Sequence, residues 1–385
     1  MKAITLKNRP RHPRLMGLDL RRANRISRTA PTPFLLLRTK IIRDNINRLR
    51  GALPGVEIFY AVKANNHSAI IRSLSQENCN FDISSVRELN DVLSVGVGPE
   101  RMIHTNPIKI PHEFEAAVNQ GVDTFVADNP DELEKFTKFG NKAGVLLRFK
   151  TKNSGSVVDL SYKFGAEPED VPDLLDKVIR LEIPFRGFCF HVGSQCTDIS
   201  AYSGAIEQAA GLIETARSKG LTVPILDIGG GFPIEYTDKT PSIEEIGAQI
   251  MAALRRNINP TTRIICEPGR FISGNTSTLF SSVIGKAVRD GSNWYYIDDG
   301  LYGSFSGRLF DHCAYQILTH RNTTWEKAVL AGPTCDSFDV IYDECLMPPL
   351  EIGDILMFPT MGAYCSVSAS DFNGLERTRI IEVDW

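Results

Sequence analysis

Residues 58–63 read Ile58-Phe59-Tyr60-Ala61-Val62-Lys63. Apolar and aromatic residues that favour strands end here in one amine, which predicts a buried strand that stops at Lys63. Burial disfavours the charged form of lysine, so the pKa of this amine would fall and it would become nucleophilic near neutral pH. Such an amine can form a Schiff base, whereas the alternative for this segment alone is a solvated loop lysine.

Similar runs recur along the chain and alternate with stretches of helical periodicity. The predicted strands are residues 56–62, 80–84, 101–105, 124–127, 144–149, 185–191, 223–228 and 263–266. The predicted helices are residues 85–95, 110–120, 130–139, 168–182, 199–219 and 242–258. Eight strands alternating with helices indicate parallel βα units, and their number and length favour a closed (β/α)8 barrel over an open sheet. We predict an α/β fold with a TIM-like barrel over residues 37–273.

The chain changes character after about residue 273, where apolar runs come closer together and helical periodicity is scarce. This pattern predicts an antiparallel, β-sandwich-like domain over residues 274–385. Residues 1–36 are predicted to form an arm and a strand, Pro33–Arg38, that joins this domain. The first thirty residues hold seven arginines and a single carboxylate, Asp19, which is typical of a solvated arm and weakly resembles a targeting segment.

Composition limits the possible partners. The chain has 385 residues, 42% hydrophobic and 23% charged, with a net charge of -3, which suits a two-domain globular protein. The small net charge argues against binding to nucleic acid or an anionic membrane, and no apolar stretch is long enough to span a bilayer. Eight cysteines without metal-type spacing predict no metal site and a cytoplasmic, reducing location.

Polar side chains and a glycine triplet follow the predicted strands, at the end of a barrel where catalytic residues gather. They are Lys63, Asp82, Arg148, His191, Gly229, Gly230, Gly231 and Glu267. Adjacent glycines let backbone N–H groups approach a phosphate, and Arg270 could pair with the same group. A lysine, a carboxylate and a phosphate cradle together suggest pyridoxal phosphate, with Lys63 carrying it covalently and Glu267 facing the pyridine nitrogen. A glycine triplet alone is as often a plain turn.

The order of motifs resembles the ornithine decarboxylase family, whose pyridoxal phosphate enzymes also include diaminopimelate and arginine decarboxylases. The matching motifs are residues 60–65 (Tyr-Ala-Val-Lys-Ala-Asn), 81–85 (Phe-Asp-Ile-Ser-Ser), 190–194 (Phe-His-Val-Gly-Ser), 226–233 (Leu-Asp-Ile-Gly-Gly-Gly-Phe-Pro), 267–270 (Glu-Pro-Gly-Arg), 332–336 (Gly-Pro-Thr-Cys-Asp) and 361–364 (Met-Gly-Ala-Tyr). They run from Lys63 to Tyr364, so the resemblance covers nearly the whole chain.

The resemblance implies a role for each matched residue. His191 would stack on the cofactor ring, and Ser194, Gly229, Gly230, Gly231, Arg270 and Tyr364 would surround its phosphate. Asp82, Glu88 and Arg148 would orient the groups that touch the cofactor. Cys335 and Asp336 would enter the active site of the opposite subunit, which requires a homodimer with shared sites. Cys335 would return a proton after carbon dioxide leaves, and Asp336 would bind the distal amine of the substrate.

The resemblance also implies a substrate pocket, which is where the sequence departs from the family. Tyr302 and Asp311 match the segment that lines the far end of the substrate. The carboxylates of Asp311 and Asp336 together favour a basic amino acid over diaminopimelate. Residues 305–310 read Phe-Ser-Gly-Arg-Leu-Phe where ornithine decarboxylases usually have Phe-Asn-Cys-Ile-Leu-Tyr. Arg308 therefore points either to solvent or to a carboxylate on a modified substrate.

Ornithine is the predicted substrate, with lysine second. The alternatives are a decarboxylase of a larger carboxylated amine in siderophore or antibiotic biosynthesis, a diaminopimelate decarboxylase, a racemase, and a non-catalytic relative that acts as a binding protein. The Cys335-Asp336 pair argues against a racemase, and the complete set of matched cofactor residues argues against a non-catalytic relative.

Overall fold

The computed structural model describes residues 5–6, 26, 30–151, 155–321 and 323–385. The chain forms two compact units. The barrel unit comprises residues 42–234 and 240–272, and the β unit comprises residues up to 41, 235–239 and 273–385. The predicted arginine-rich arm lies outside the described residues, apart from a two-residue strand, β1 (Thr5–Leu6), and residues 26 and 30. Within the described ranges, no helix is both long and apolar enough to cross a membrane.

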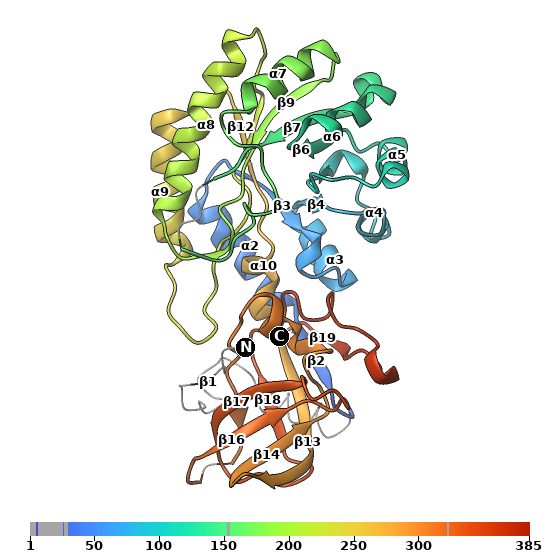
Figure 1. Ribbon diagram of the computed structural model, residues 1–385, viewed down its shortest axis with the longest axis vertical. Coiled ribbons are helices and arrows are strands. Elements are labelled where there is room, and N and C mark those ends of the chain that lie inside the picture. Colours follow the sequence, from blue (N-terminus) through green and yellow to red (C-terminus); the bar gives the residue numbers. More distant parts are fainter. Residues whose placement is uncertain (1–4, 7–25, 27–29, 152–154, 322) are drawn as a thin grey trace. The chain divides into compact units, whose positions relative to one another are not determined.

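Parallel strands close into a barrel in the barrel unit, as the alternation predicted (Figure 1). The neighbours follow the order β11-β12-β3-β4-β5-β6-β7-β9, with β9 returning to β11. Each strand lies within a range predicted from the sequence. The strands are β3 (Glu57–Ala61), β4 (Asn80–Ile83), β5 (Met102–His104), β6 (Thr124–Ala127), β7 (Gly144–Arg148), β9 (Phe185–Cys189), β11 (Ile225–Asp227) and β12 (Arg263–Cys266).

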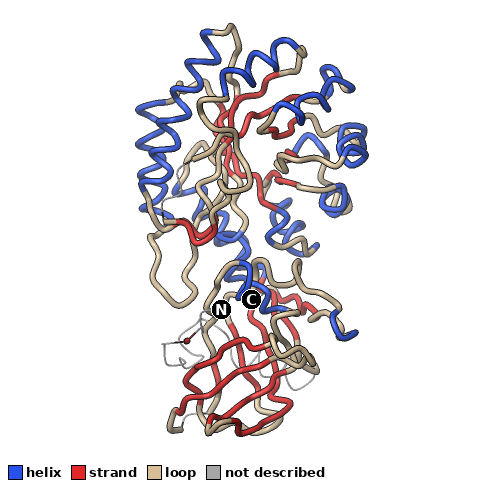
Figure 2. Tube along the Cα trace, viewed as in Figure 1, coloured by secondary structure: helices blue, strands red, loops and turns tan. Residues whose placement is uncertain are grey.

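Helices surround these strands in the same unit, shown in blue in Figure 2. They are α2 (Thr39–Ala52), α3 (Ser68–Gln76), α4 (Val86–Leu93), α5 (Pro111–Asn119), α6 (Pro130–Glu134), α7 (Val171–Arg180), α8 (Ser200–Ser218), α9 (Ile243–Asn257) and α10 (Arg270–Ser273). Three of them, α2, α3 and α10, are not among the predicted helices. The N-cap of α3 is His67, whose ring accepts the Ala69 N–H, so the usual Ser, Thr, Asp or Asn signal is missing there.

Side chains fill the barrel interior. One buried cluster takes a residue from each of seven strands: Phe59, Ile103, Val126, Leu146, Cys189, Ile225 and Ile265. Parallel strands covered on both faces read as continuous apolar runs, which is why the sequence pattern located them well. A small two-stranded antiparallel sheet pairs β8 (Ser156–Val158) with β10 (Ser194–Cys196) and was not predicted.

The β unit contains one nine-stranded sheet in the order β1-β17-β16-β14-β13-β18-β15, with β2 joining β13 and β19 joining β2. Its strands are β2 (Phe34–Arg38), β13 (Ser277–Arg289), β14 (Ser292–Ile297), β15 (Leu318–Thr319), β16 (Glu326–Ala331), β17 (Val340–Met347), β18 (Ile355–Phe358) and β19 (Arg379–Val383). The early strand β2 pairs antiparallel with β13. A short helix, α11 (Gly307–Phe310), interrupts the strands.

This sheet is mixed, whereas the sequence predicted antiparallel pairing in this domain. Three described pairs are parallel: β14 with β16, β2 with β19 and β1 with β17. Closely spaced apolar runs suggested hairpins, but residues 298–325 lie between β14 and β16 and give the chain room to cross over. The strand β13 is 13 residues long and pairs with β14 through its second half and with β2 and β18 through its first.

Candidate active site

Lys63 lies two residues after the end of β3, within a short 3₁₀ helix, Val62–Ala64. Its Nζ is 2.6 Å from Oδ2 of Asp82, which is fully buried in the neighbouring strand β4, opposite Ala61. The Lys63 side chain is 39% exposed. The predicted burial of Lys63 is therefore only partial, because the strand ends before the lysine, and its amine is paired with a carboxylate.

Asp82 joins Lys63 to the strand beside it. Its Oδ1 accepts a hydrogen bond from the Thr105 hydroxyl, while Oδ2 faces the ammonium. Burial raises the pKa of the Asp82 carboxyl to about 6, and the Lys63 charge opposes that rise. Glu88, at the start of α4, accepts the Ser84 N–H at 2.6 Å, and burial raises its pKa to about 7. The amine is thus oriented by buried acids close to their ionisation point.

Glu267 and Asp227 form a second acidic pair at the ends of β12 and β11. Both carboxyls are buried. Burial, followed by repulsion from Asp227, raises the pKa of Glu267 well above its ordinary value. Burial likewise raises the pKa of Asp227 to about 6. Burial and mutual repulsion therefore favour the protonated form of this pair, and a protonated pyridine nitrogen would let Glu267 ionise.

The glycine triplet lies where side chains do not fit. Gly229 and Gly231 have φ of +66° and +95°. A Cβ on Gly230 would lie 2.4 Å from the carbonyl oxygen of Glu267 and 3.3 Å from Nε2 of His191. The backbone therefore passes close to the acidic pair and to the histidine, and only glycine permits this approach.

Two side chains suited to binding an anion, those of Arg270 and Ser194, meet in the barrel unit, which also contains a second arginine, Arg148. Nη2 of Arg270, at the start of α10, donates to Oγ of Ser194 at 3.1 Å. Arg148 ends β7, with its guanidinium carbon 5.4 Å from the centroid of the Phe164 ring. A guanidinium beside a hydroxyl is a recurrent phosphate-binding arrangement.

His191 follows β9 as a neutral imidazole. Its Nδ1 accepts the Gly193 N–H at 3.0 Å. Burial, with the cations of Arg148 and Lys63, holds the pKa of His191 well below its usual range. A neutral, flat ring can stack on a cofactor ring without adding charge to it. These groups fit pyridoxal phosphate: an amine for the aldehyde, a buried carboxyl for the pyridine nitrogen, and a guanidinium and a hydroxyl for the phosphate.

The predicted substrate residues belong to the β unit, where two of them, Tyr302 and Asp336, meet. The Tyr302 hydroxyl donates to Oδ2 of Asp336, next to the exposed Cys335. This hydrogen bond lowers the pKa of Asp336, which is therefore an anion at neutral pH. The Tyr302 ring stacks on Phe372, with centroids 4.3 Å apart. Sequence reasoning missed Phe372 and its neighbour Asn373, whose one visible signal is the turn-forming Asn-Gly pair at 373–374.

Tyr364 and Asp311 lie elsewhere in the β unit. Tyr364 has a left-handed backbone, φ +57°, and its carbonyl accepts hydrogen bonds from the hydroxyls of Ser306 and Ser368. Asp311 follows α11, and its N–H donates to the Gly307 carbonyl at 3.1 Å.

Arg308 requires a correction, because it is neither solvated nor exposed to a substrate. The residue is 1% exposed. Its Nε donates to the Ile341 carbonyl at 3.1 Å and its Nη1 to the Cys313 carbonyl at 2.6 Å. The guanidinium carbon lies 4.3 Å from the centroid of the Tyr342 ring. The cation stabilises the interior of the β unit, so the argument for a carboxylated substrate no longer has an observation behind it.

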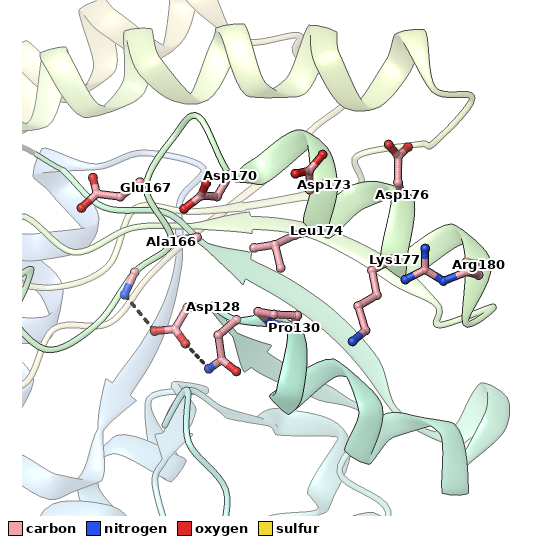
Figure 3. Close-up of a pocket in the computed structure, with 12 residues that line it drawn as sticks. Asp128, Pro130, Ala166, Glu167, Asp170, Asp173, Leu174, Asp176, Lys177 and Arg180 are labelled. Carbon is pink, nitrogen blue, oxygen red and sulfur yellow. Dashed lines mark hydrogen bonds between the residues drawn. The ribbon is translucent and has the colours of Figure 1, made fainter.

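A separate cavity of about 790 Å³ lies beside α6 and α7 (Figure 3). Most of its ionisable lining groups are carboxylates. Asp128 accepts hydrogen bonds from the Gly165 N–H at 2.8 Å and from Nδ2 of Asn129 at 2.9 Å. Within the described chain, the residues around this cavity include none of the predicted cofactor residues, so it is not the cofactor site.

The barrel and its amine, acid and phosphate-binding groups define a pyridoxal phosphate enzyme. The family model of the pyridoxal-binding domain of pyridoxal-dependent decarboxylases matches residues 39–274, and the chain belongs to this family. It is a pyridoxal phosphate-dependent amino-acid decarboxylase, and its relatives include lysine/ornithine and arginine decarboxylases.

Individual relatives cover nearly the whole chain. The lysine/ornithine decarboxylase of Selenomonas ruminantium is 36% identical over 355 residues, 91% of this chain and 89% of the relative. The lysine/ornithine decarboxylase of Vibrio vulnificus, solved with cadaverine, is 37% identical with a TM-score of 0.90 and covers 95% and 99% of the two chains. The arginine decarboxylase of Paramecium bursaria Chlorella virus is 32% identical with a TM-score of 0.90 and covers 94% and 100%.

Proposed function

We propose that this chain decarboxylates L-ornithine to putrescine, with L-lysine as second substrate, and that it does so as a cytoplasmic homodimer with shared active sites. The observation that carries the substrate is the anionic Asp336 held by Tyr302 beside an exposed thiol. A carboxylate at this position would bind the distal ammonium of a basic amino acid. It would repel the second carboxylate of diaminopimelate.

The residues of the barrel unit would hold the cofactor, and one residue of the β unit, Cys335, would supply the proton. When bound, pyridoxal phosphate supplies an aldehyde for the amine and a ring that takes up the electron pair released with carbon dioxide. Lys63 would bind the cofactor, and Asp82 would orient its amine, to which it is paired. Glu267 would face the pyridine nitrogen and favour its protonated form, while Arg270 and Ser194, which are hydrogen-bonded to each other, would bind the phosphate. Cys335 returns a proton to the α-carbon.

The substrate is tested with purified protein, pyridoxal phosphate and a panel of L-ornithine, L-lysine, L-arginine and meso-diaminopimelate. Product mass should identify putrescine as the diamine formed with the highest kcat/KM. Lys63→Ala should lose both the cofactor absorbance band and carbon dioxide release. If none of the basic amino acids yields carbon dioxide, or if diaminopimelate is preferred, the proposal is refuted.

Shared active sites are tested by mixing two inactive variants. Lys63→Ala damages one half of a shared site and Cys335→Ala the other. After subunit exchange in an equal mixture, half of the dimers combine the two variants and have one intact site of two. About a quarter of wild-type activity should therefore return, since one site of each mixed dimer combines the two intact halves and the other site combines the two damaged halves. No recovery, despite demonstrated exchange, would contradict sites built from two subunits.

A further inference from the structure

Asn373 holds Cys335 through both ends of its side-chain amide. Its Oδ1 accepts the Cys335 backbone N–H at 3.0 Å, and its Nδ2 donates to the Cys335 Sγ at 3.3 Å. Asn373 lies in a short 3₁₀ segment, Phe372–Gly374, and has a left-handed backbone with φ +57°. We propose that Asn373 is a positioning residue, which orients the Cys335 thiol and stabilises the thiolate left after proton donation. This inference rests on the proposed function of Cys335.

The chemistry of the proton transfer explains why such a donor matters. When carbon dioxide leaves, the electron pair of the broken bond remains associated with the α-carbon of the substrate. The Sγ–H bond of Cys335 then breaks, the proton bonds to that carbon, and the electron pair stays on sulfur. A solvent proton restores the thiol before the next turnover. An N–H aimed at sulfur stabilises the thiolate more than the thiol, so it favours the forward transfer.

The charges around Cys335 make this donor more important. Asp336 is adjacent in sequence, and Asp339 and the hydrogen-bonded hydroxyl of Tyr302 lie in the same electrostatic neighbourhood. Asp371, on the Asn373 side, is paired with Arg377 at 2.9 Å. Nearby carboxylates disfavour a negative charge on the Cys335 sulfur. The Asn373 amide, at hydrogen-bonding distance from the sulfur, opposes this effect.

Thiol alkylation can measure this contact directly. Cys335 is exposed, whereas the other seven cysteines are buried, so iodoacetamide should report on Cys335 in the cofactor-loaded protein. Asn373→Gly keeps the left-handed backbone and removes both contacts. Asn373→Asp keeps an acceptor for the Cys335 N–H and places a carboxylate at the sulfur. Asn78→Gly is the matched control, because Asn78 is also exposed and left-handed, with φ +53°.

We expect the alkylation profile of both Asn373 variants to move to higher pH. Below the plateau, Asn373→Gly should react about tenfold more slowly, the size expected for one hydrogen bond to a charged group. Asn373→Asp should shift further, and Asn78→Gly should match wild type. The kcat of Asn373→Gly should fall by a similar factor with KM nearly unchanged, because Cys335 acts after substrate binding.

Each other outcome has a distinct meaning. An unchanged pH profile of alkylation in both Asn373 variants overturns the inference. An equal loss of reactivity at every pH, together with a lower melting temperature, also overturns it, because this result would indicate a structural role alone. If wild type releases no carbon dioxide from basic amino acids, the proposed function fails while the alkylation profile still tests the contact. If Cys335→Ala keeps its kcat, the proton-donor role fails, and the role of Asn373 fails with it.

Discussion

Replacing Arg308 with methionine removes a buried cation from the β unit while keeping an unbranched side chain. Two charge-assisted hydrogen bonds to backbone carbonyls would be lost, each worth about 1.5 kcal/mol or more. The stacking on Tyr342, with 4.3 Å from the guanidinium carbon to the ring centroid, adds about 2 kcal/mol in a desolvated setting.

Relief of the buried charge offsets part of this loss. Burial lowers the pKa of the Arg308 guanidinium below its ordinary value, and among the described atoms its Nη2 has no hydrogen-bond partner. Removing such a group returns about 1–3 kcal/mol. The net expectation for Arg308→Met is that the β unit loses about 3 kcal/mol of unfolding free energy.

Tryptophan fluorescence during urea unfolding measures this loss in the right part of the chain, because all three tryptophans, Trp294, Trp325 and Trp385, belong to the β unit. Arg289→Met is the matched control. Arg289 donates one hydrogen bond, to Tyr296, and its guanidinium lies over the Trp294 ring. The site is exposed, so we expect Arg289→Met to lower the unfolding free energy by less than about 1 kcal/mol. An unfolding free energy of Arg308→Met that lies within about 0.5 kcal/mol of the wild-type value would refute the reasoning.

Two further predictions concern the barrel unit. Gly230→Ala should weaken pyridoxal phosphate binding by about tenfold or more in an absorbance titration, since its Cβ would lie 2.4 Å from the Glu267 carbonyl oxygen; Gly211→Ala, with no atom within 4 Å of its Cβ, should bind as wild type. Burial lowers the pKa of His104 to about 4, so the unfolded chain binds its proton first and stability present at pH 7 is lost as pH falls from about 6.5 to about 4. His104→Leu should therefore gain about 3 kcal/mol relative to wild type between pH 7 and pH 4 in circular-dichroism unfolding, and a difference that does not change with pH would contradict this.

The barrel could be predicted because its information is local. Each strand is a largely apolar and largely buried run of three to five residues, and helical periodicity separates one run from the next. Parallel strands bring their C-terminal ends to one side of a barrel, so placing Lys63, Asp82 and Glu267 at strand ends was enough to predict a common site.

The tertiary structure decided what depends on long-range contacts. Arg308 looked like a surface or substrate residue because two of the groups that hold it, the Ile341 carbonyl and the Tyr342 ring, belong to a distant strand; Ile341 lies 33 positions further on. Asn373 reaches Cys335 across 38 positions. The sequence determined which chemical groups the protein has and which strands present them. The path of the chain through the β unit decided which cation is buried and which amide meets the thiol, because such pairings depend on where distant segments pack and not on any local pattern.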